Sequence, residues 1–124
     1  MLIVSSILAR LGVPGYTAYC ASKSGLLGLM RSWAASFTAE HILCNAVCPG
    51  WVNTEMARQG LRGFAEGSGK SFDEVLAEQM AMVPLGKMSE PAEIAAMARY
   101  LLNGQQTSVT GQTFDINNGA LMPC

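Results

Sequence analysis

Charged residues are scarce in this chain, and the two signs nearly cancel. Only 14% of the residues are charged, and eight Lys and Arg stand against nine Asp and Glu, for a net charge of −1. This balance gives no electrostatic reason to expect binding to nucleic acid or to an anionic membrane. No apolar run reaches the roughly 18 residues that a membrane span needs, and the opening residues lack the basic region of a signal peptide. We therefore expect a cytoplasmic protein that binds neither nucleic acid nor membrane.

Metal-binding patterns are also missing. The single histidine, His41, stands alone, and no Cys-x-x-Cys pair occurs among Cys20, Cys44, Cys48 and Cys124. Cys44 and Cys48 are four residues apart, but they lie in a segment that reads as a strand and so do not form a tight pair. We expect no metal site and no disulfide framework, and we interpret the cysteines as small buried thiols.

Strand-like and helix-like segments alternate along the chain. Half of the 124 residues are apolar, which suits one folded domain. The continuous apolar run at residues 2–4 predicts a strand buried on both faces, residues 42–47 predict a second buried strand, and a third strand is expected at 112–116. Apolar residues at helical spacing predict helices at 17–37, 72–80 and 89–102. This alternation predicts an α/β fold built on a parallel sheet with right-handed crossovers.

The boundaries of these elements have their own signals. The long helix carries one apolar stripe, and the last helix has a candidate N-cap in Ser89 with Pro91 in its first turn and an Asn103–Gly104 stop. Residues 51–71 are rich in glycine and polar groups, so we expect a long functional loop there, of the kind that covers a site. The stripe of the long helix consists of Leu26, Leu29, Met30, Trp33 and Phe37.

The first predicted strand has no neighbour on its outer side within this chain. An apolar strand of the buried type is a liability at an exposed edge. We therefore expect a further segment upstream that covers this edge.

The strongest chemical signal is the pair Tyr19 and Lys23. Their i, i+4 spacing places both on one face of a helix, one turn apart. A free phenol is a poor acid or base at neutral pH, and a nearby ammonium favours its ionised form. Ser6 ends the preceding strand, and its hydroxyl can donate to a carbonyl oxygen beside the tyrosine. The three side chains together can move a proton to or from an oxygen while hydride moves at carbon.

A Tyr-x-x-x-Lys pattern alone is weak, because many helices carry a half-buried tyrosine and a surface lysine by chance. The surrounding sequence changes this interpretation. Residues 4–6 and 12–26, 45–56, 84–95 and 109–119 resemble four motifs of the short-chain dehydrogenase/reductase family, in order and at the family's spacing. The similarity covers nearly the whole chain, and 3-oxoacyl-carrier-protein reductases are the members it most resembles. The resemblance implies a partial Rossmann-like doubly wound fold, of which this chain holds about three contiguous parallel strands with flanking helices.

The resemblance implies a role for each matching residue. Tyr19 would be the general acid/base, Lys23 would assist it and bind the nicotinamide ribose, and Ser6, rather than Ser5, would polarise the substrate carbonyl. The cofactor would be NAD or NADP, and the substrate a small carbonyl or alcohol. The family's cofactor loop corresponds to Pro49, Gly50, Val52 and Thr54, although Pro49–Gly50 also suits a plain turn and Thr54 also suits a helix cap.

The remaining motif residues have less definite roles. Residues 53–72 match the family's variable substrate loop, where Met56, Leu61 and Phe64 would line a pocket or simply anchor the loop. We interpret Asn45 as a residue that organises backbone. Complete members of the family form dimers or tetramers, so the resemblance also implies a homo-oligomer.

The chain departs from the family in its extent. The glycine-rich nucleotide-binding turn, the residue that selects NAD or NADP and the Asn-Asn-Ala-Gly segment are all absent, and Asn117–Asn118–Gly119 is a different turn. We interpret residues 1–124 as the C-terminal catalytic half of a reductase domain, a truncated or mis-started product or one piece of it. Alone, it would bind NAD(P) weakly or not at all. The alternative is a non-catalytic fragment that acts through oligomer contacts.

Overall fold

Three parallel strands form the centre of the molecule, and the computed structural model describes residues 1–122. The strands are β1 (Leu2–Val4), β2 (Asn45–Pro49) and β3 (Thr113–Ile116), in the spatial order β1-β2-β3. Leu2 pairs with Asn45, and Ala46 pairs with Thr113. The predicted α/β fold with contiguous parallel strands is confirmed.

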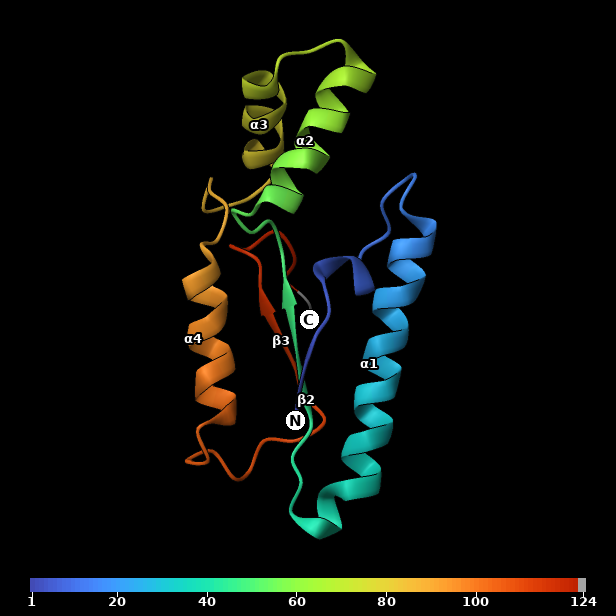
Figure 1. Ribbon diagram of the computed structural model, residues 1–124, viewed down its shortest axis with the longest axis vertical. Helices are drawn as coiled ribbons and strands as arrows, with labels where there is room; N and C mark the ends of the chain where they lie inside the picture. Colours follow the sequence, from blue (N-terminus) through green and yellow to red (C-terminus); the bar gives the residue numbers. More distant parts are fainter. Residues whose placement is uncertain (123–124) are drawn as a thin grey trace.

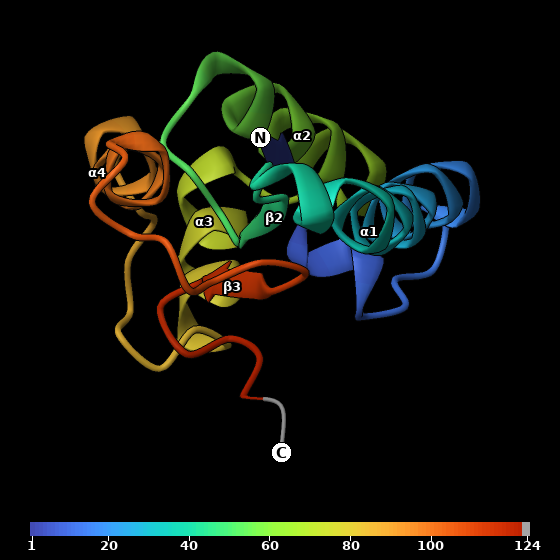
Figure 2. The same cartoon turned by 90° about the horizontal axis from the view of Figure 1, so that it is seen from below.

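Helices lie on both sides of this sheet and beyond one end of it. The long helix α1 (Thr17–Phe37) and the helix α4 (Pro91–Leu102) lie on opposite sides of the strands (Figures 1 and 2). The helices α2 (Glu55–Ser68) and α3 (Phe72–Ala81) lie beyond the carboxyl ends of the strands, toward which the arrows point (Figure 1). Two short 3-10 turns, η1 (Ile7–Ala9) and η2 (Thr38–Glu40), flank α1. Among the described residues, no helix is long and apolar enough to cross a membrane.

The helix α1 has the predicted bounds but turns a different line of residues toward the sheet. Leu27, Met30 and Ala34 are buried, and the first two pack with Ala46 and Cys48 of β2. Met30 belongs to the predicted stripe, whereas Leu29 is 39% exposed. The helix is apolar on two adjacent sides, so periodicity could not tell which side faces the sheet.

Residues 51–71 do not form the predicted loop. Most of them belong to α2, which begins after the N-cap Thr54 and ends at Gly69 in the left-handed region with a φ of 68°. Its glycines lower the intrinsic helix propensity. The helix is nevertheless stabilised by packing, because Leu61 and Ala65 are buried against Val75 of α3. The loop prediction was wrong because it was based on the glycine and polar content of the segment and not on the helical spacing of Leu61 and Ala65.

Several strand and helix ends differ from the predicted ones by a few residues. The middle strand begins at Asn45 and not at 42, because His41 adopts a left-handed conformation and turns the chain after η2. The strand β3 begins at Thr113, since the backbone N–H of Gln112 donates to the side chain of Asn45. The helix predicted at 72–80 is confirmed as α3.

The N-cap of α4 is Glu90, so the prediction of Ser89 as the N-cap was wrong and lies one residue too early. Ser89 is buried, and its backbone joins the segment at 51–53 through bonds to Trp51 and Asn53. Its hydroxyl accepts a hydrogen bond from Asn118. Ser89 therefore fixes the start of α4 against the loop after β2.

The outer edge of β1 carries no strand in the described part of the chain. Its residues are half-buried or exposed, and Val4 is 55% exposed. The prediction of a strand buried on both faces is therefore wrong for β1, while the predicted open edge is observed.

The thiols are distributed between the core and the surface. Cys44 and Cys48 are buried and Cys20 is half-buried, and all three are free. Cys124 lies outside the described residues. Within residues 1–122, no three His, Cys, Asp or Glu side chains are grouped to hold a metal.

Candidate active site

The carboxyl end of β1 and the first turns of α1 bring the predicted catalytic residues into one region. Ser5 and Ser6 follow directly after β1, and Tyr19 and Lys23 lie in the first two turns of α1. The turn η1 packs against α1 between them. The sequence between strand and helix thus folds back so that the strand end and the helix start are adjacent.

Tyr19 and Lys23 lie on the same face of α1. The Lys23 Nζ is 5.6 Å from the centre of the Tyr19 ring, a distance at which an ammonium interacts with an aromatic ring. Tyr19 is 39% exposed, so its hydroxyl can reach a substrate. The ammonium also donates to the Val4 carbonyl over 3.5 Å, and it has no carboxylate partner among residues 1–122. The charge therefore acts on the tyrosine without a competing anion.

Ser6 is buried and held in place by its own turn. Its Oγ accepts a hydrogen bond of 3.1 Å from the backbone N–H of Leu8, which caps η1. A hydroxyl also carries one donor, and the Ser6 proton is bound to no acceptor in the described structure. The side chain is therefore oriented and still able to donate to a carbonyl oxygen.

Ser5 makes a contact that the sequence did not predict. Its Oγ donates to the backbone carbonyl of Lys23 over 2.8 Å, and the residue is only 4% exposed. Ser24 makes a second link between the same segments, since its hydroxyl donates to the carbonyl of Ala9. The two serines join η1 and the strand end to the helix turn that carries Lys23. Sequence spacing alone had no signal for these bonds, because they join residues 15 and 18 positions apart.

The loop after β2 approaches another strand end at Gly50. A side chain at Gly50 would place its Cβ 2.9 Å from Cβ and 3.0 Å from Cα of Asn117, so only glycine fits without a shift. The Gly50 N–H donates to Ile116. This close approach brings the loop directly over the carboxyl ends of β2 and β3.

The same loop leaves one backbone donor free. Val52 forms an isolated parallel bridge with Ser89, in which the bonds are made by Trp51 and Asn53. The N–H of Val52 itself donates to no group in residues 1–122. Thr54 caps α2 through its Oγ1, which accepts from Ala57 and also lies 3.4 Å from the Val52 carbonyl. The capping role that the sequence left open for Thr54 is thus present.

The three residues predicted for the substrate loop differ in how far they are exposed to solvent. Met56 is 76% exposed and Leu61 is fully buried between α2 and α3, so the position of Leu61 fits an anchor. Phe64 is 36% exposed, and its ring centre lies 6.1 Å from that of Tyr16. Tyr16 in turn meets Tyr19 edge to face at 6.4 Å. A short row of aromatic rings therefore joins α2 to the predicted catalytic tyrosine, through Tyr16, which the sequence had not singled out.

The surroundings of Cys48, which lies beside Ser5 and Ser6, disfavour its thiolate form. Burial raises the pKa of the Cys48 thiol, and the nearby carboxylate of Asp115 raises it further. Asp115 forms an ion pair with Arg10 at 2.6 Å. Its other oxygen is buried and accepts no hydrogen bond among the described residues. Cys48 is thus a neutral packing residue of the core.

Asn45 is a buried polar residue at the start of the central strand β2. Its side chain donates to the Val109 carbonyl and accepts from the Gln112 N–H. The prediction that Asn45 organises backbone is confirmed, because both bonds fix the segment that leads into β3.

Comparison with known proteins shows the family of this chain. The family described as Enoyl-(Acyl carrier protein) reductase matches residues 1–120. A short-chain dehydrogenase family protein from Francisella tularensis has a similar structure, with a TM-score of 0.90 and 30% identity over 96% of this chain. The chain belongs to the short-chain dehydrogenase/reductase family.

Curated relatives of this family member have varied names. The 3-oxoacyl-[acyl-carrier-protein] reductase FabG of Thermotoga maritima is 31% identical over 96% of this chain and 44% of its own length. The 2-(S)-hydroxypropyl-CoM dehydrogenase 3 of Xanthobacter autotrophicus is 37% identical over 92% of this chain and 43% of its own length. A second protein of that organism, 36% identical over 92% of this chain and 47% of its own length, is named an inactive 2-(S)-hydroxypropyl-CoM dehydrogenase.

Among solved structures, the F189W actinorhodin polyketide ketoreductase with NADPH has a TM-score of 0.91 and 31% identity. The match covers 96% of this chain and 46% of the ketoreductase. The chain therefore spans about half the length of the relatives that it matches.

Proposed function

We propose that this chain is the C-terminal catalytic half of an NAD(P)-dependent oxidoreductase that interconverts a carbonyl compound and an alcohol. One observation carries the proposal: the exposed Tyr19 lies beside the Lys23 ammonium, which has no carboxylate partner in the described chain. The same ammonium donates to the Val4 carbonyl over 3.5 Å, which also holds it at the end of β1. The family membership supports the same reaction.

Each residue has a role in moving one proton. A bound nicotinamide supplies hydride to the carbonyl carbon, or accepts it in the reverse direction. Tyr19 donates its phenolic proton to the carbonyl oxygen during reduction and takes it back from the alcohol during oxidation. Lys23 stabilises the phenolate that remains, and Ser6 donates a hydrogen bond to the same oxygen.

The residues after β2 fit a nicotinamide group. The close approach at Gly50 keeps side-chain atoms away from the surface above the strands, and the free N–H of Val52 is a donor for a carboxamide oxygen. Thr54 can contribute if its hydroxyl gives up the long contact with the Val52 carbonyl. Pro49 ends β2 and fixes where this loop begins. Lys23 would bind the ribose hydroxyls of the cofactor.

The substrate is proposed only as a class. The relatives' names refer to acyl-carrier-protein, coenzyme-M and polyketide substrates, which share a carbonyl or alcohol and little else. Met56 and Phe64 are the exposed apolar side chains of α2 that can line the substrate side. A complete enzyme of this family is expected to be a homo-oligomer.

The test compares Tyr19→Phe with Tyr16→Phe in the full-length protein. Loss of the phenolic proton donor at Tyr19 should lower kcat for NAD(P)H-dependent carbonyl reduction by about 10²- to 10⁴-fold, with cofactor affinity nearly unchanged. The neighbouring change at Tyr16 keeps the ring and should leave kcat within about threefold of the wild type. Equal turnover in wild type and Tyr19→Phe would refute the assigned role.

A second candidate function is association without catalysis. The outward side of α1 exposes Leu29, and β1 has an unpaired edge, so both surfaces are available to another chain. Light scattering and size-exclusion chromatography of the isolated chain test this reading. A stable dimer or tetramer with no cofactor binding supports it, and a clean monomer argues against it.

A further inference from the structure

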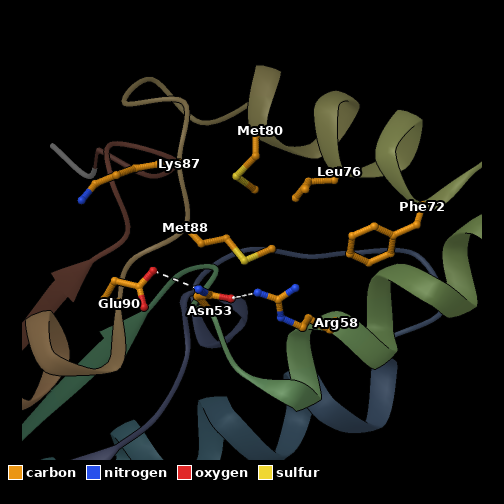
Figure 3. Close-up of a pocket in the computed structure, with 8 residues that line it drawn as sticks. All are labelled: Asn53, Arg58, Phe72, Leu76, Met80, Lys87, Met88 and Glu90. Carbon is orange, nitrogen blue, oxygen red and sulfur yellow. Dashed lines mark hydrogen bonds between the residues drawn. The ribbon is translucent and has the colours of Figure 1, made fainter.

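An open pocket of about 370 Å³ lies between α2, α3 and the segment that leads into α4 (Figure 3). Its volume is within the range of small-molecule sites. Its lining includes none of the residues Ser6, Tyr19 or Lys23, so it is separate from the proposed catalytic group. Eight residues line it: Asn53, Arg58, Phe72, Leu76, Met80, Lys87, Met88 and Glu90.

One wall of the pocket is apolar and fixed in place. Phe72, Leu76 and Met80 recur every four residues on α3, and Met88 faces them from the α4 side (Figure 3). Phe72, Leu76 and Met88 also pack against the buried cluster between α2 and α3, which holds the wall rigid. Met80 is unbranched and adapts to the shape of an apolar ligand.

The other end of the pocket carries an uncompensated positive charge. The guanidinium of Arg58 donates to Asn53 Oδ1 over 2.7 Å and has no carboxylate partner among residues 1–122. The nearby cations differ, because Lys87 pairs with Glu93 and Arg62 pairs with Glu55. A guanidinium carries five N–H donors, so most of those on Arg58 remain for a ligand.

The one acid in the lining is kept apart from this charge. The Asn53 side chain lies between Arg58 and Glu90, since its Nδ2 donates to Glu90 Oε1 over 2.9 Å (Figure 3). Glu90 also belongs to the capping box of α4. A ligand anion placed on the far side of Arg58 from Asn53 therefore avoids the Glu90 carboxylate.

We propose that this pocket binds a carboxylate with an apolar alkyl or aryl body. The planar guanidinium of Arg58 matches a carboxylate in a two-bond contact. The apolar body lies against Phe72, Leu76 and Met80 and is removed from water. Asn53, Arg58 and Phe72 fall within residues 53–72, the range matched to the family's substrate loop, but the binding proposed here uses none of Ser6, Tyr19 and Lys23 and can be measured without turnover.

The test is isothermal titration of the full-length protein with decanoate, below its micelle concentration and without nucleotide. Saturable binding of one decanoate per chain is expected. Arg58→Gln should weaken binding by about tenfold or more, because a charge-assisted contact is lost. The matched change Arg62→Gln, one turn further along α2, should alter the affinity less than about twofold.

Two further measurements separate the contribution of the carboxylate to the affinity from that of the apolar chain. Neutral 1-decanol should bind about tenfold or more weakly than decanoate if the carboxylate is recognised. Leu76→Trp should fill the pocket and abolish binding, with circular dichroism as the check on folding. The proposal is overturned if decanoate shows no saturable binding, if Arg58→Gln and Arg62→Gln lose affinity equally, or if decanol binds as tightly as decanoate.

Discussion

The hydroxyl of Ser5 donates to the backbone carbonyl of Lys23 over 2.8 Å and thereby joins the end of β1 to the second turn of α1. The bond lies in a buried region, since Ser5 is 4% exposed. Ser6, Tyr19 and Lys23 come from two elements, so their relative placement depends on how firmly those elements are joined.

Ser5→Ala should lower the free energy of unfolding by about 1 kcal/mol, the usual net contribution of one hydrogen bond. Denaturant unfolding of the chain measures this. Ser32→Ala is the control, because Ser32 is an exposed residue of α1 with no side-chain hydrogen bond in the described structure; it should change stability by less than about 0.5 kcal/mol. Equal stability of Ser5→Ala and wild type would contradict a stabilising link.

Gly50→Ala should destabilise the fold by about 1–3 kcal/mol, because its Cβ would be forced against the backbone of Asn117. Gly28→Ala is the opposite case. Gly28 lies on α1 with no atom within 4 Å of an added Cβ, so alanine should stabilise the helix by up to about 1 kcal/mol. Thermal unfolding of both variants gives the comparison, and a Gly50→Ala protein as stable as wild type would show that the loop can move away from Asn117.

The ring contact between Tyr16 and Phe64 should appear as a coupling free energy. A double-mutant cycle with Tyr16→Leu and Phe64→Leu should give about 0.5–1.5 kcal/mol, the range of aromatic pairs. The control cycle pairs Tyr16→Leu with Phe72→Leu, whose rings form no contact. It should give no coupling beyond about 0.5 kcal/mol. Equal values from the two cycles would remove the evidence for the aromatic row.

Acid should weaken the helix caps of α3 and α4. The Lys87 ammonium and the Glu90 N–H lower the pKa of Glu93, and the backbone and side chain of Ser71 lower that of Glu74. A carboxyl with a lowered folded-state pKa contributes stability above its unfolded pKa, and this contribution is lost as the pH falls through the folded value.

The stability of Glu93→Gln should therefore depend less on pH than that of the wild type below about pH 4.5. Urea unfolding at a series of pH values measures the slope. Glu66→Gln serves as the control, because Glu66 is exposed and forms no side-chain hydrogen bond in the described chain. An unchanged acid slope in Glu93→Gln would rule out a cap contribution from Glu93.

The Cys48 thiol should resist alkylation in the folded protein. It is fully buried, and burial and the Asp115 carboxylate raise its pKa, so little thiolate forms at pH 8. Iodoacetamide followed by peptide mass spectrometry should label the half-buried Cys20 first. In denaturant both should react at similar rates, and rapid native labelling of Cys48 would show that the core opens readily.

Much of the fold could be predicted, because strands and long helices have strong local signals. The helix α1 has the predicted bounds. The alternation of elements predicted parallel strands, and the family resemblance predicted that the three are contiguous. The helix α2 was not predicted, because Gly60, Gly63 and Gly67 suggested a loop. Its buried side consists of only Leu61 and Ala65, which are buried by packing against α3. The sequence signals for this helix were Thr54, which caps its start, and Gly69, which ends it.

Sequence spacing predicted that Tyr19 and Lys23 share a helix face, but it did not predict the contacts that join this helix to other segments. The pairing of Tyr19 with Lys23 follows from helical spacing, and the place of Ser6 follows from the strand end. The bond from Ser5 to Lys23, and the ring of Tyr16 between Phe64 and Tyr19, depend on how segments meet in space. The uncompensated charge of Arg58 depends on the partners chosen by its neighbours, which a sequence does not specify.

The spatial order of the strands repeats their order along the chain. During synthesis, β2 can therefore dock on a strand that has already left the ribosome, and β3 can dock on β2. No strand has to enter between two that are already paired. This part of the chain can assemble in the direction of translation, by growth at one edge of the sheet.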